Sequence, residues 1–311
     1  MISFKNTLDF FLEKESVITF GKFDGLHRGH ELLMDNLKEK KALCGYQTVV
    51  FTFDIPPKRG LTGEISKQIT TNEEKEQIFE VAGVDCLIEC PFVPEVMTLE
   101  PEAFIRWIVE KLKVKAVVVG DDFCFGHNRS GNHETLKQFE KKYGYETIVV
   151  DKVKDNGRDI SSTYIREEIA AGNIAKANKL LGYPFFVKGL VVHGRKIGRT
   201  IGIPTINMIL PEDKLLPPFG VYITRVCIGD SWYAGVSNVG CKPTIEGDNP
   251  VGLETYIIDF CQDVYDKLVT VQFIEFIRPE MKFNSIEELK QQMNNDIAKT
   301  VKYYRNITEM C

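Results

Sequence analysis

The sequence predicts two domains: an α/β domain with a doubly wound parallel sheet, then a small six-stranded antiparallel β-barrel that ends in a helix. Through about residue 150, short apolar runs alternate with helical patterns, as expected for strands joined by helices. After residue 184, strand-like runs follow one another without intervening helices. A chain of 311 residues allows each domain its own core. We place the border between residues 183 and 184, giving domains 1–183 and 184–311, because Gly182 ends a helical pattern and Pro184 follows it.

The first domain is expected to have five strands, at residues 17–20, 48–53, 84–89, 116–119 and 147–150. The helices between them have recognisable starts. Thr71 with Glu74 forms a capping box, Pro101 opens a second helix and Asn132 can cap a third. A sheet of this kind binds its ligand outside the carboxyl ends of its strands.

The second domain is expected to have six strands, at residues 185–192, 205–209, 221–228, 232–236, 253–258 and 268–276. Their close spacing and the Gly/Pro turns favour an antiparallel barrel. A final helix is capped by Ser285 with Glu288. Its expected buried face is formed by Ile286, Leu289, Met293, Ile297 and Val301.

Composition excludes several classes of protein. The net charge of −5 argues against a protein that coats nucleic acid, because that work needs a basic surface. The eight cysteines contain no Cys-x-x-Cys pair, so we expect reduced thiols and a cytoplasmic protein. No signal-peptide pattern and no apolar run of membrane-spanning length is present, so we expect no membrane association.

The turn after the first strand is the strongest candidate for a binding site. Gly21 and Gly25 interrupt the strand pattern, and a helical pattern opens at about Arg28. His27 and His30 therefore lie at a helix N-terminus, where free backbone N–H groups favour an anion. Gly29 lacks the side chain that would hold a phosphate away. The alternative is a surface turn that happens to contain two histidines.

Three further loops follow strands at the same edge, at residues 54–59, 120–129 and 158–163. Phe123 and Phe125 are either core residues or, beside acidic side chains and Arg129, could stack on a flat heterocycle. Ser161 or Ser162 is a natural helix cap. With Arg166 one turn into the helix, these hydroxyls could instead stabilise a departing pyrophosphate.

The barrel half contains a glycine-rich loop between its first two strands. Gly194, Gly198 and Gly202 with three interspersed cations suit a loop around a polyphosphate, although a barrel corner has a similar composition. Thr205 and Asn207 offer two neutral oxygens for Mg²⁺ beside phosphate. Strand alternation sets Glu254 apart from its neighbours. It is a candidate base if it lies at the barrel mouth, and otherwise an exposed strand glutamate.

Several of these motifs resemble those of known families. His27-x-Gly-His30 is similar to the first signature of the nucleotidyltransferases, and Ser-Ser-Thr-x-Ile-Arg at 161–166 is similar to their second. Over nearly its whole length the chain resembles the bacterial bifunctional riboflavin kinase/FAD synthetase family. Its kinase motifs are matched by Gly-Arg…Gly-x-Pro-Thr-x-Asn at 194–207, Gly-Val-x-Asn-x-Gly-x-x-Pro-Thr at 235–244 and Arg-Pro-Glu-x-Lys-Phe at 278–283.

This resemblance implies a Rossmann-like FMN adenylyltransferase domain and a riboflavin kinase domain. The barrel would phosphorylate riboflavin with ATP to FMN, and the α/β domain would join FMN to AMP, giving FAD and pyrophosphate, with Mg²⁺ in both steps. The implied catalytic residues are Glu254 as base, with His27, His30 and Arg166 at the ATP phosphates. The implied ATP-binding residues are Gly21, Phe23, Asp24, Gly25, Gly29, Ser162, Thr163, Gly194, Arg195, Gly198, Gly202 and Thr205. The implied flavin-binding residues are Asp122, Phe125, Arg129 and Arg278, and the implied Mg²⁺ ligands are Thr205 and Asn207.

Two departures from the family pattern fall in the first domain. The loop that is usually Asp-Pro-His-Pro is Asp-Ile-Pro-Pro at 54–57, and Lys22 replaces a common asparagine. Any weakening should therefore affect adenylyl transfer. The alternatives are a nucleotidyltransferase of another substrate, a tRNA synthetase relative, or a flavin-binding regulator with decayed sites. We expect small-molecule partners only, no nucleic acid, and a monomer or weak homo-oligomer.

Overall fold

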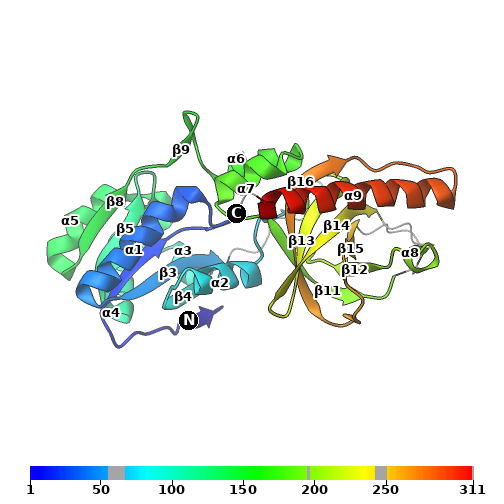
Figure 1. Ribbon diagram of the computed structural model, residues 1–311. Helices are drawn as coiled ribbons and strands as arrows, with labels where there is room; N and C mark the ends of the chain where they lie inside the picture. The colour runs from blue at the N-terminus through cyan, green and yellow to red at the C-terminus, as the bar shows by residue number, and fades with distance from the viewer. Residues whose placement is uncertain (55–66, 195–196, 242–250, 310–311) are drawn as a thin grey trace. The chain divides into compact units, whose positions relative to one another are not determined.

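The computed structural model describes residues 1–54, 67–194, 197–241 and 251–309, and the chain forms two compact units (Figure 1). The first comprises Met1–Ser66 and Thr70–Ser162, and the second comprises Lys67–Ile69 and Thr163–Cys311. The units therefore divide by packing near residue 162. The division of the two activities at 183/184 stays a prediction.

The first unit is a three-layer α/β fold. Its strands are β1 Ile2–Lys5, β2 Ser16–Phe20, β3 Gln47–Asp54, β4 Cys86–Pro91, β5 Val114–Gly120, β6 Cys124–Phe125, β7 Gly131–Asn132, β8 Glu146–Val150, β9 Lys154–Asp155 and β10 Arg158–Asp159. Its helices are η1 Arg28–His30, α1 Glu31–Cys44, α2 Asn72–Val81, α3 Pro94–Met97, α4 Pro101–Leu112, η2 His127–Arg129 and α5 His133–Tyr143. The main sheet has the order β1-β4-β3-β2-β5-β8 and is parallel throughout, so the predicted doubly wound sheet is confirmed.

The sheet has one more strand than the sequence predicted. Residues of β1 pair in parallel with β4, Ile2 opposite Cys86, and extend the edge of the sheet. The chain winds one way from β2 through β3 to β4 and the other way through β5 to β8. The turns that follow β2 and β5 therefore leave the sheet at its switch point, where an open α/β sheet binds ligands.

The two faces of the sheet carry separate apolar cores. On one face, Leu33 and Leu37 of α1 and Phe79 of α2 pack against Val50 of the sheet. On the other, α4 and α5 cover the strands. The predicted capping box at Thr71 and Glu74 is present, and Thr71 Oγ1 accepts a hydrogen bond from the Glu74 N–H.

The second unit is a closed antiparallel barrel with flanking helices. Its elements are α6 Ser162–Ala170, α7 Ile174–Leu181, β11 Phe186–Val192, α8 Ile197–Thr200, β12 Thr205–Ile209, β13 Gly220–Ile228, β14 Ser231–Cys241, β15 Val251–Ile257, β16 Leu268–Arg278 and α9 Ile286–Glu309. The strand order is β11-β12-β15-β14-β13-β16, with β16 returning to β11, so the predicted six-stranded barrel is confirmed.

The barrel interior is filled by side chains. Tyr222 and Phe273 are fully buried and their rings meet edge to face at 5.2 Å between centroids. A buried chain of hydroxyls joins three strands, with 2.7 Å from Thr224 Oγ1 to Ser237 Oγ and 2.8 Å from Ser237 Oγ to Thr255 Oγ1. Because every member has a partner, burying these hydroxyls carries little penalty.

Helix α7 is attached to the barrel through one asparagine. Asn178 Nδ2 donates to the Phe273 carbonyl of β16 at 2.8 Å, and Asn178 Oδ1 accepts from the Phe185 N–H at 2.7 Å. Ala177, Leu180 and other apolar residues of the same helix are buried. The helix therefore stabilises the start of the first barrel strand, although it precedes the predicted domain border.

We predict that Asn178→Ala destabilises the second unit by about 1–3 kcal/mol, because it leaves two buried backbone groups without a partner. Denaturant unfolding followed by Trp232 emission in a Trp107→Phe background would measure this, since these are the two tryptophans of the chain. The matched control is Asn173→Ala, whose side chain bonds to Glu168 at the exposed start of the same helix. Equal midpoints for the two variants would contradict the prediction.

Candidate active sites

The histidine turn of the first unit is a single 3₁₀ turn between β2 and α1. The His30 N–H donates to the His27 carbonyl at 2.7 Å, which closes the turn. The two imidazoles stack with 3.9 Å between ring centroids and an interplanar angle of 21°. Both Nδ1 atoms are buried and have no hydrogen-bond partner within the described residues. A buried polar atom without a partner is costly, so these nitrogens are candidates for binding a ligand.

Both imidazoles are kept neutral by their surroundings. Burial lowers the pKa of His27 to about 4, and the nearby Asp24 carboxylate opposes only part of this shift. Burial, and then the neighbouring His27, lowers the pKa of His30 well below its usual value. At pH 7 the turn therefore presents neutral hydrogen-bonding imidazoles.

Gly29 is required by packing against protein atoms. A Cβ at this position would lie 2.7 Å from the Ile160 carbonyl oxygen and 2.8 Å from the His27 ring. The sequence argument explained Gly29 by close approach of a phosphate, whereas the structure shows that protein atoms already exclude a side chain there. Gly21 has a similar constraint, because its Cβ would lie 2.8 Å from the Phe23 ring.

Phe23 and Asp24 hold the turn in place. Phe23 has a left-handed φ of 45°, is almost fully buried, and meets Phe79 edge to face. Such a backbone costs of order 1–3 kcal/mol in a non-glycine residue and persists only where packing enforces it. Asp24 is 2% exposed; its carboxylate accepts from the Thr70 N–H at 3.2 Å, and its carbonyl accepts from Ser162 Oγ at 2.7 Å. Ser162 thus supports the turn directly.

The predicted flavin-binding residues of the first unit have different environments. Asp122 pairs with Lys152 at 2.9 Å, whereas Arg129 is exposed with a left-handed φ of 58°. Phe125 is 7% exposed in the apolar core and stacks on Phe123 at 5.5 Å between centroids. Its burial favours the core role that the sequence left open.

Thr163 and Arg166 belong to the second compact unit, where Arg166 Nη1 donates to the Lys67 carbonyl. The structure therefore does not place them beside the histidines. The unusual loop at residues 55–57 and the predicted ATP-binding residue Arg195 lie outside the described residues.

The second unit carries its site on the outer face of the barrel. Strand register sets five side chains in one row across five neighbouring strands, each opposite the next. The row is Asn207, Glu254, Asn238, Val221 and Arg278. Residues beside Glu254 on β15, such as Leu253 and Thr255, are fully buried. Glu254 is thus neither at the barrel mouth nor simply exposed.

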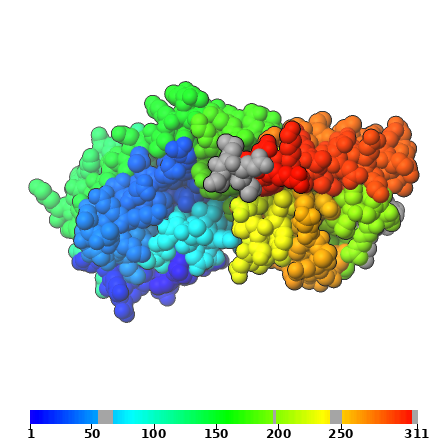
Figure 2. Space-filling view, viewed as in Figure 1, coloured from blue at the N-terminus to red at the C-terminus, as the bar shows by residue number. Residues whose placement is uncertain are grey.

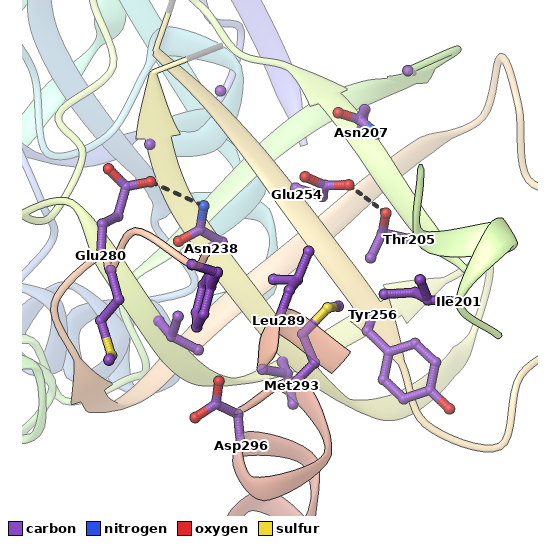
Figure 3. A pocket seen from close by; sticks show the side chains of 18 of the residues that line it. Ile201, Thr205, Asn207, Asn238, Glu254, Tyr256, Glu280, Leu289, Met293 and Asp296 are labelled. Carbon is purple, nitrogen blue, oxygen red and sulfur yellow. Dashed lines mark hydrogen bonds between the residues drawn. The ribbon is translucent and has the colours of Figure 1, made fainter. Parts of the chain in front are cut away.

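All five residues of this row line a cavity of about 1000 Å³. Strands supply one wall, and α9 supplies Leu289, Met293 and Asp296 on the opposite side (Figure 3). Figure 2 shows α9 in orange and red along the surface of its unit, with the other side of the helix toward solvent. A largely apolar cavity with a few convergent polar groups is typical of a small-molecule site.

Thr205 and Glu254 are joined inside the cavity. The Thr205 hydroxyl donates to Glu254 Oε1, and Asn207 lies two residues along the same strand, directly opposite Glu254 (Figure 3). The structure thus brings together the predicted base and the two predicted Mg²⁺ ligands of this half.

Phosphate binding is only part of the reason for the glycines in the glycine-rich loop. A Cβ on Gly194 would lie 2.3 Å from Asn207 Nδ2, and one on Gly198 would lie 2.2 Å from the Ile203 carbonyl oxygen. Both glycines line the cavity, so they allow the loop to pack closely beside the polar row. Gly202 has a left-handed φ of 81°, which is the conformation that glycine adopts most readily.

Three polar residues of the cavity were not predicted as site residues, although Asn238 and Glu280 lie in the matched motifs at 235–244 and 278–283. Asn238 Nδ2 donates to Glu280 Oε1 at 3.1 Å, and Asp296 holds Arg278. Asp296 had a detectable signal, because it falls within the apolar stripe of the last helix, next to Ile297. The expectation for Ile286 in that stripe was wrong, since it is 57% exposed at the free start of α9.

The fold and the two sites define a two-part protein, a parallel-sheet nucleotidyltransferase unit followed by a kinase-type barrel. Residues 11–164 match the family model described as FAD synthetase, and residues 181–304 match the one described as riboflavin kinase. The bifunctional riboflavin kinase/FMN adenylyltransferase of Listeria monocytogenes is 34% identical over 306 residues, covering 97% of both chains. The protein of the same name from Bacillus subtilis is 35% identical over 95% of this chain and 94% of that one.

The chain therefore belongs to the family of bifunctional riboflavin kinase/FMN adenylyltransferases, and the resemblance seen in the sequence is confirmed. A solved structure titled as a macrolide-efflux protein from Streptococcus pneumoniae has a TM-score of 0.85 and 33% identity, covering 96% of this chain and 98% of that one. In the described part of this chain, no helix has the length and apolar character that crossing a membrane requires.

We predict that acid destabilises the first unit through His27. The unfolded chain binds the proton near pH 6.5 but the folded unit only near pH 4, so stability is complete above pH 6.5 and falls as the pH drops toward 4. This difference corresponds to about 3 kcal/mol. Denaturation followed by Trp107 emission in a Trp232→Phe background should show the loss, and His27→Gln should reduce it.

The control is His193→Gln, which removes an exposed histidine from the other unit. It should leave the acid sensitivity of the first unit unchanged. Parallel loss of stability in the parent and in His27→Gln between pH 7 and pH 4 would contradict a role for His27.

Proposed function

We propose that the second unit phosphorylates riboflavin with ATP and that the first unit adenylylates the resulting FMN. The observation that carries the proposal is the barrel cavity, where Thr205 meets Asn207 and Glu254 of the row beside an apolar wall. A flat apolar ring with a polar chain suits a cavity lined in this way. The relatives named above are bifunctional riboflavin kinase/FMN adenylyltransferases, which supports the same assignment.

In the kinase step, Glu254 is the base. Its carboxylate takes the proton of the terminal hydroxyl of riboflavin as that oxygen forms a bond to the γ-phosphorus of ATP. The bond from the γ-phosphorus to the bridging oxygen breaks, and ADP leaves with the electron pair. The hydrogen bond from Thr205 fixes one carboxylate oxygen and leaves the other for the substrate. Catalysis of this kind depends mainly on positioning and charge stabilisation.

Thr205 and Asn207 fit a magnesium ion that is bound together with phosphate. A hydroxyl and an amide oxygen are hard ligands, and Mg²⁺ normally keeps several waters and takes few protein ligands. Within the described residues no group of three or more His, Cys, Asp or Glu side chains could hold a metal ion without a substrate. When bound, the ion would neutralise charge on the phosphates of ATP.

In the adenylyl transfer step, a phosphate oxygen of FMN attacks the α-phosphorus of ATP and pyrophosphate leaves. The His27 and His30 imidazoles are neutral at pH 7, and each keeps one N–H that can donate a hydrogen bond to a phosphate oxygen. We assign them to the α-phosphate, with Gly21, Gly25 and the backbone of the turn around it. Ser162, Thr163 and Arg166 are assigned to the departing pyrophosphate by their match to the second signature of the family.

We predict that Glu254→Gln abolishes most riboflavin phosphorylation. Glutamine keeps the size and can still accept from Thr205, but it cannot take the proton, a loss of ~10²–10⁴-fold in rate. Chromatographic separation of flavins after incubation with riboflavin, ATP and magnesium would measure it. Supplied with FMN, the same variant should make FAD at the parent rate.

The matched control is Glu275→Gln, another strand glutamate of the barrel that does not line the cavity. It should phosphorylate riboflavin normally. Near-normal phosphorylation by Glu254→Gln would reduce Glu254 to a structural residue, whereas joint loss of both activities would mean that the variant disturbs the fold.

We also propose that the activities divide at the 183/184 border, and predict that fragment 184–311 makes FMN but no FAD. Because Asn178 holds Phe185 and Phe273, the fragment 163–311 should make FMN too and melt at a higher temperature. Thermal denaturation and the flavin assay on both fragments would test this. A folded 184–311 fragment that is inert toward riboflavin would overturn the proposed border.

A further inference from the structure

Arg278 belongs to strand β16 but is held by a residue of helix α9. It ends β16, and its guanidinium reaches Asp296 of α9 in a bidentate ion pair. Nη2 donates to Asp296 Oδ2 at 2.8 Å, and Nε lies 3.1 Å and 3.2 Å from the two carboxylate oxygens. Arg278 Nη1 donates to the Pro279 carbonyl at 3.0 Å. Paired hydrogen bonds of this kind fix the plane of a guanidinium as well as its position.

The Asp296 carboxylate is committed to this task. It is 3% exposed, and its Oδ1 also accepts from Gln292 Nε2 at 3.0 Å, one turn earlier on the same helix. Both of its oxygens are therefore occupied. By contrast, in the described structure the bonds of Arg278 use three of the five guanidinium N–H groups. One N–H on each terminal nitrogen remains for another partner.

The position of Arg278 brings its guanidinium to the cavity. Arg278 lies at the end of the row that contains Glu254, and it lines the same cavity. Asp296 lines the cavity as well, whereas Gln292 does not. A chain of contacts thus runs from Gln292, outside the site, through Asp296 to a guanidinium at the site.

We propose that Asp296 is a positioning residue for riboflavin phosphorylation, acting through Arg278. Its carboxylate holds the guanidinium so that the two remaining N–H groups face the substrate, and it compensates the positive charge of this partly buried side chain. The proposal rests on the proposed function, because it takes Arg278 to contact the flavin substrate. It also assigns α9 a second role besides covering the cavity.

The pair also fixes the segment that joins β16 to α9. Residues 279–285 contain Met281, Lys282 and Phe283, which line the cavity. This segment is held at one end by Arg278 and, through Glu280, by the bond from Asn238. Release of Arg278 would therefore loosen one wall of the site and should weaken substrate binding more than turnover.

The test is a double-mutant cycle on the full chain. We expect Asp296→Asn to lower kcat/KM for riboflavin by up to ~100-fold, mainly through KM, because a misplaced positioning group can cost that much. In an Arg278→Gln background the same change should alter kcat/KM by less than about twofold, since residues that act through one another are not additive. Gln292→Ala should shift KM in the same direction by a smaller factor.

A control variant and several further measurements decide the result. The control Glu287→Gln removes an exposed charge from the same helix and should leave KM unchanged. The proposal would be overturned if the Asp296→Asn/Arg278→Gln double variant lost kcat/KM by the product of the two single losses. It would also be overturned if Asp296→Asn lowered the melting temperature but left KM unchanged. If Asp296→Asn does not fold, an unchanged KM in Gln292→Ala overturns it. A parent enzyme that makes no FMN would instead refute the proposed function, and the KM of Arg278→Gln alone tests its flavin contact.

Discussion

The kinase site depends on strand register. Asn207, Glu254 and Asn238 share a row because β12, β15 and β14 pair residue against residue in that alignment. A slip of one residue on β15 would turn Glu254 into the packed barrel and bring Thr255 out. Barrel closure and the buried hydroxyl chain through Thr255 resist such a slip, since Thr255 would lose its partner. The same contacts that stabilise the barrel therefore also position its carboxylate.

The first unit reaches its geometry by another route. Its site is a backbone turn, and the strain at Phe23 is balanced by burial of that ring against Phe79. Burial has a chemical consequence as well. It removes water from His27 and His30, which lowers both pKa values. Neither Nδ1 has a hydrogen-bond partner among the residues that the structure describes. Packing around Gly29 holds the imidazoles together, so the turn stays neutral and ready to bind an anion without itself carrying charge.

Much of this arrangement could be predicted from the sequence, and the gaps have physical reasons. Alternation along β15 identified Glu254, and glycine spacing located the adjacent loop. The edge strand β1 escaped notice because Ile2–Lys5 is short and only half-buried, so its apolar pattern is weak. Asp296 escaped notice because its partner lies 18 residues away on another element. Propensity and period report local structure, whereas an ion pair between a strand end and a helix becomes visible only in three dimensions.

The location of the kinase cavity follows from the size of the barrel. Six strands enclose only enough space for their own side chains, here large ones such as Tyr222 and Phe273, so a ligand cannot bind inside. The polar row must therefore be on the outer face. An outer face of a barrel is open to water, in which charged interactions are weak. Helix α9 closes over this face, and Leu289 and Met293 exclude water from the side of the cavity opposite Glu254. A small closed barrel thus needs an added helix to form a closed site on its outer face. The same helix can then supply polar side chains to that site, as α9 does with Asp296.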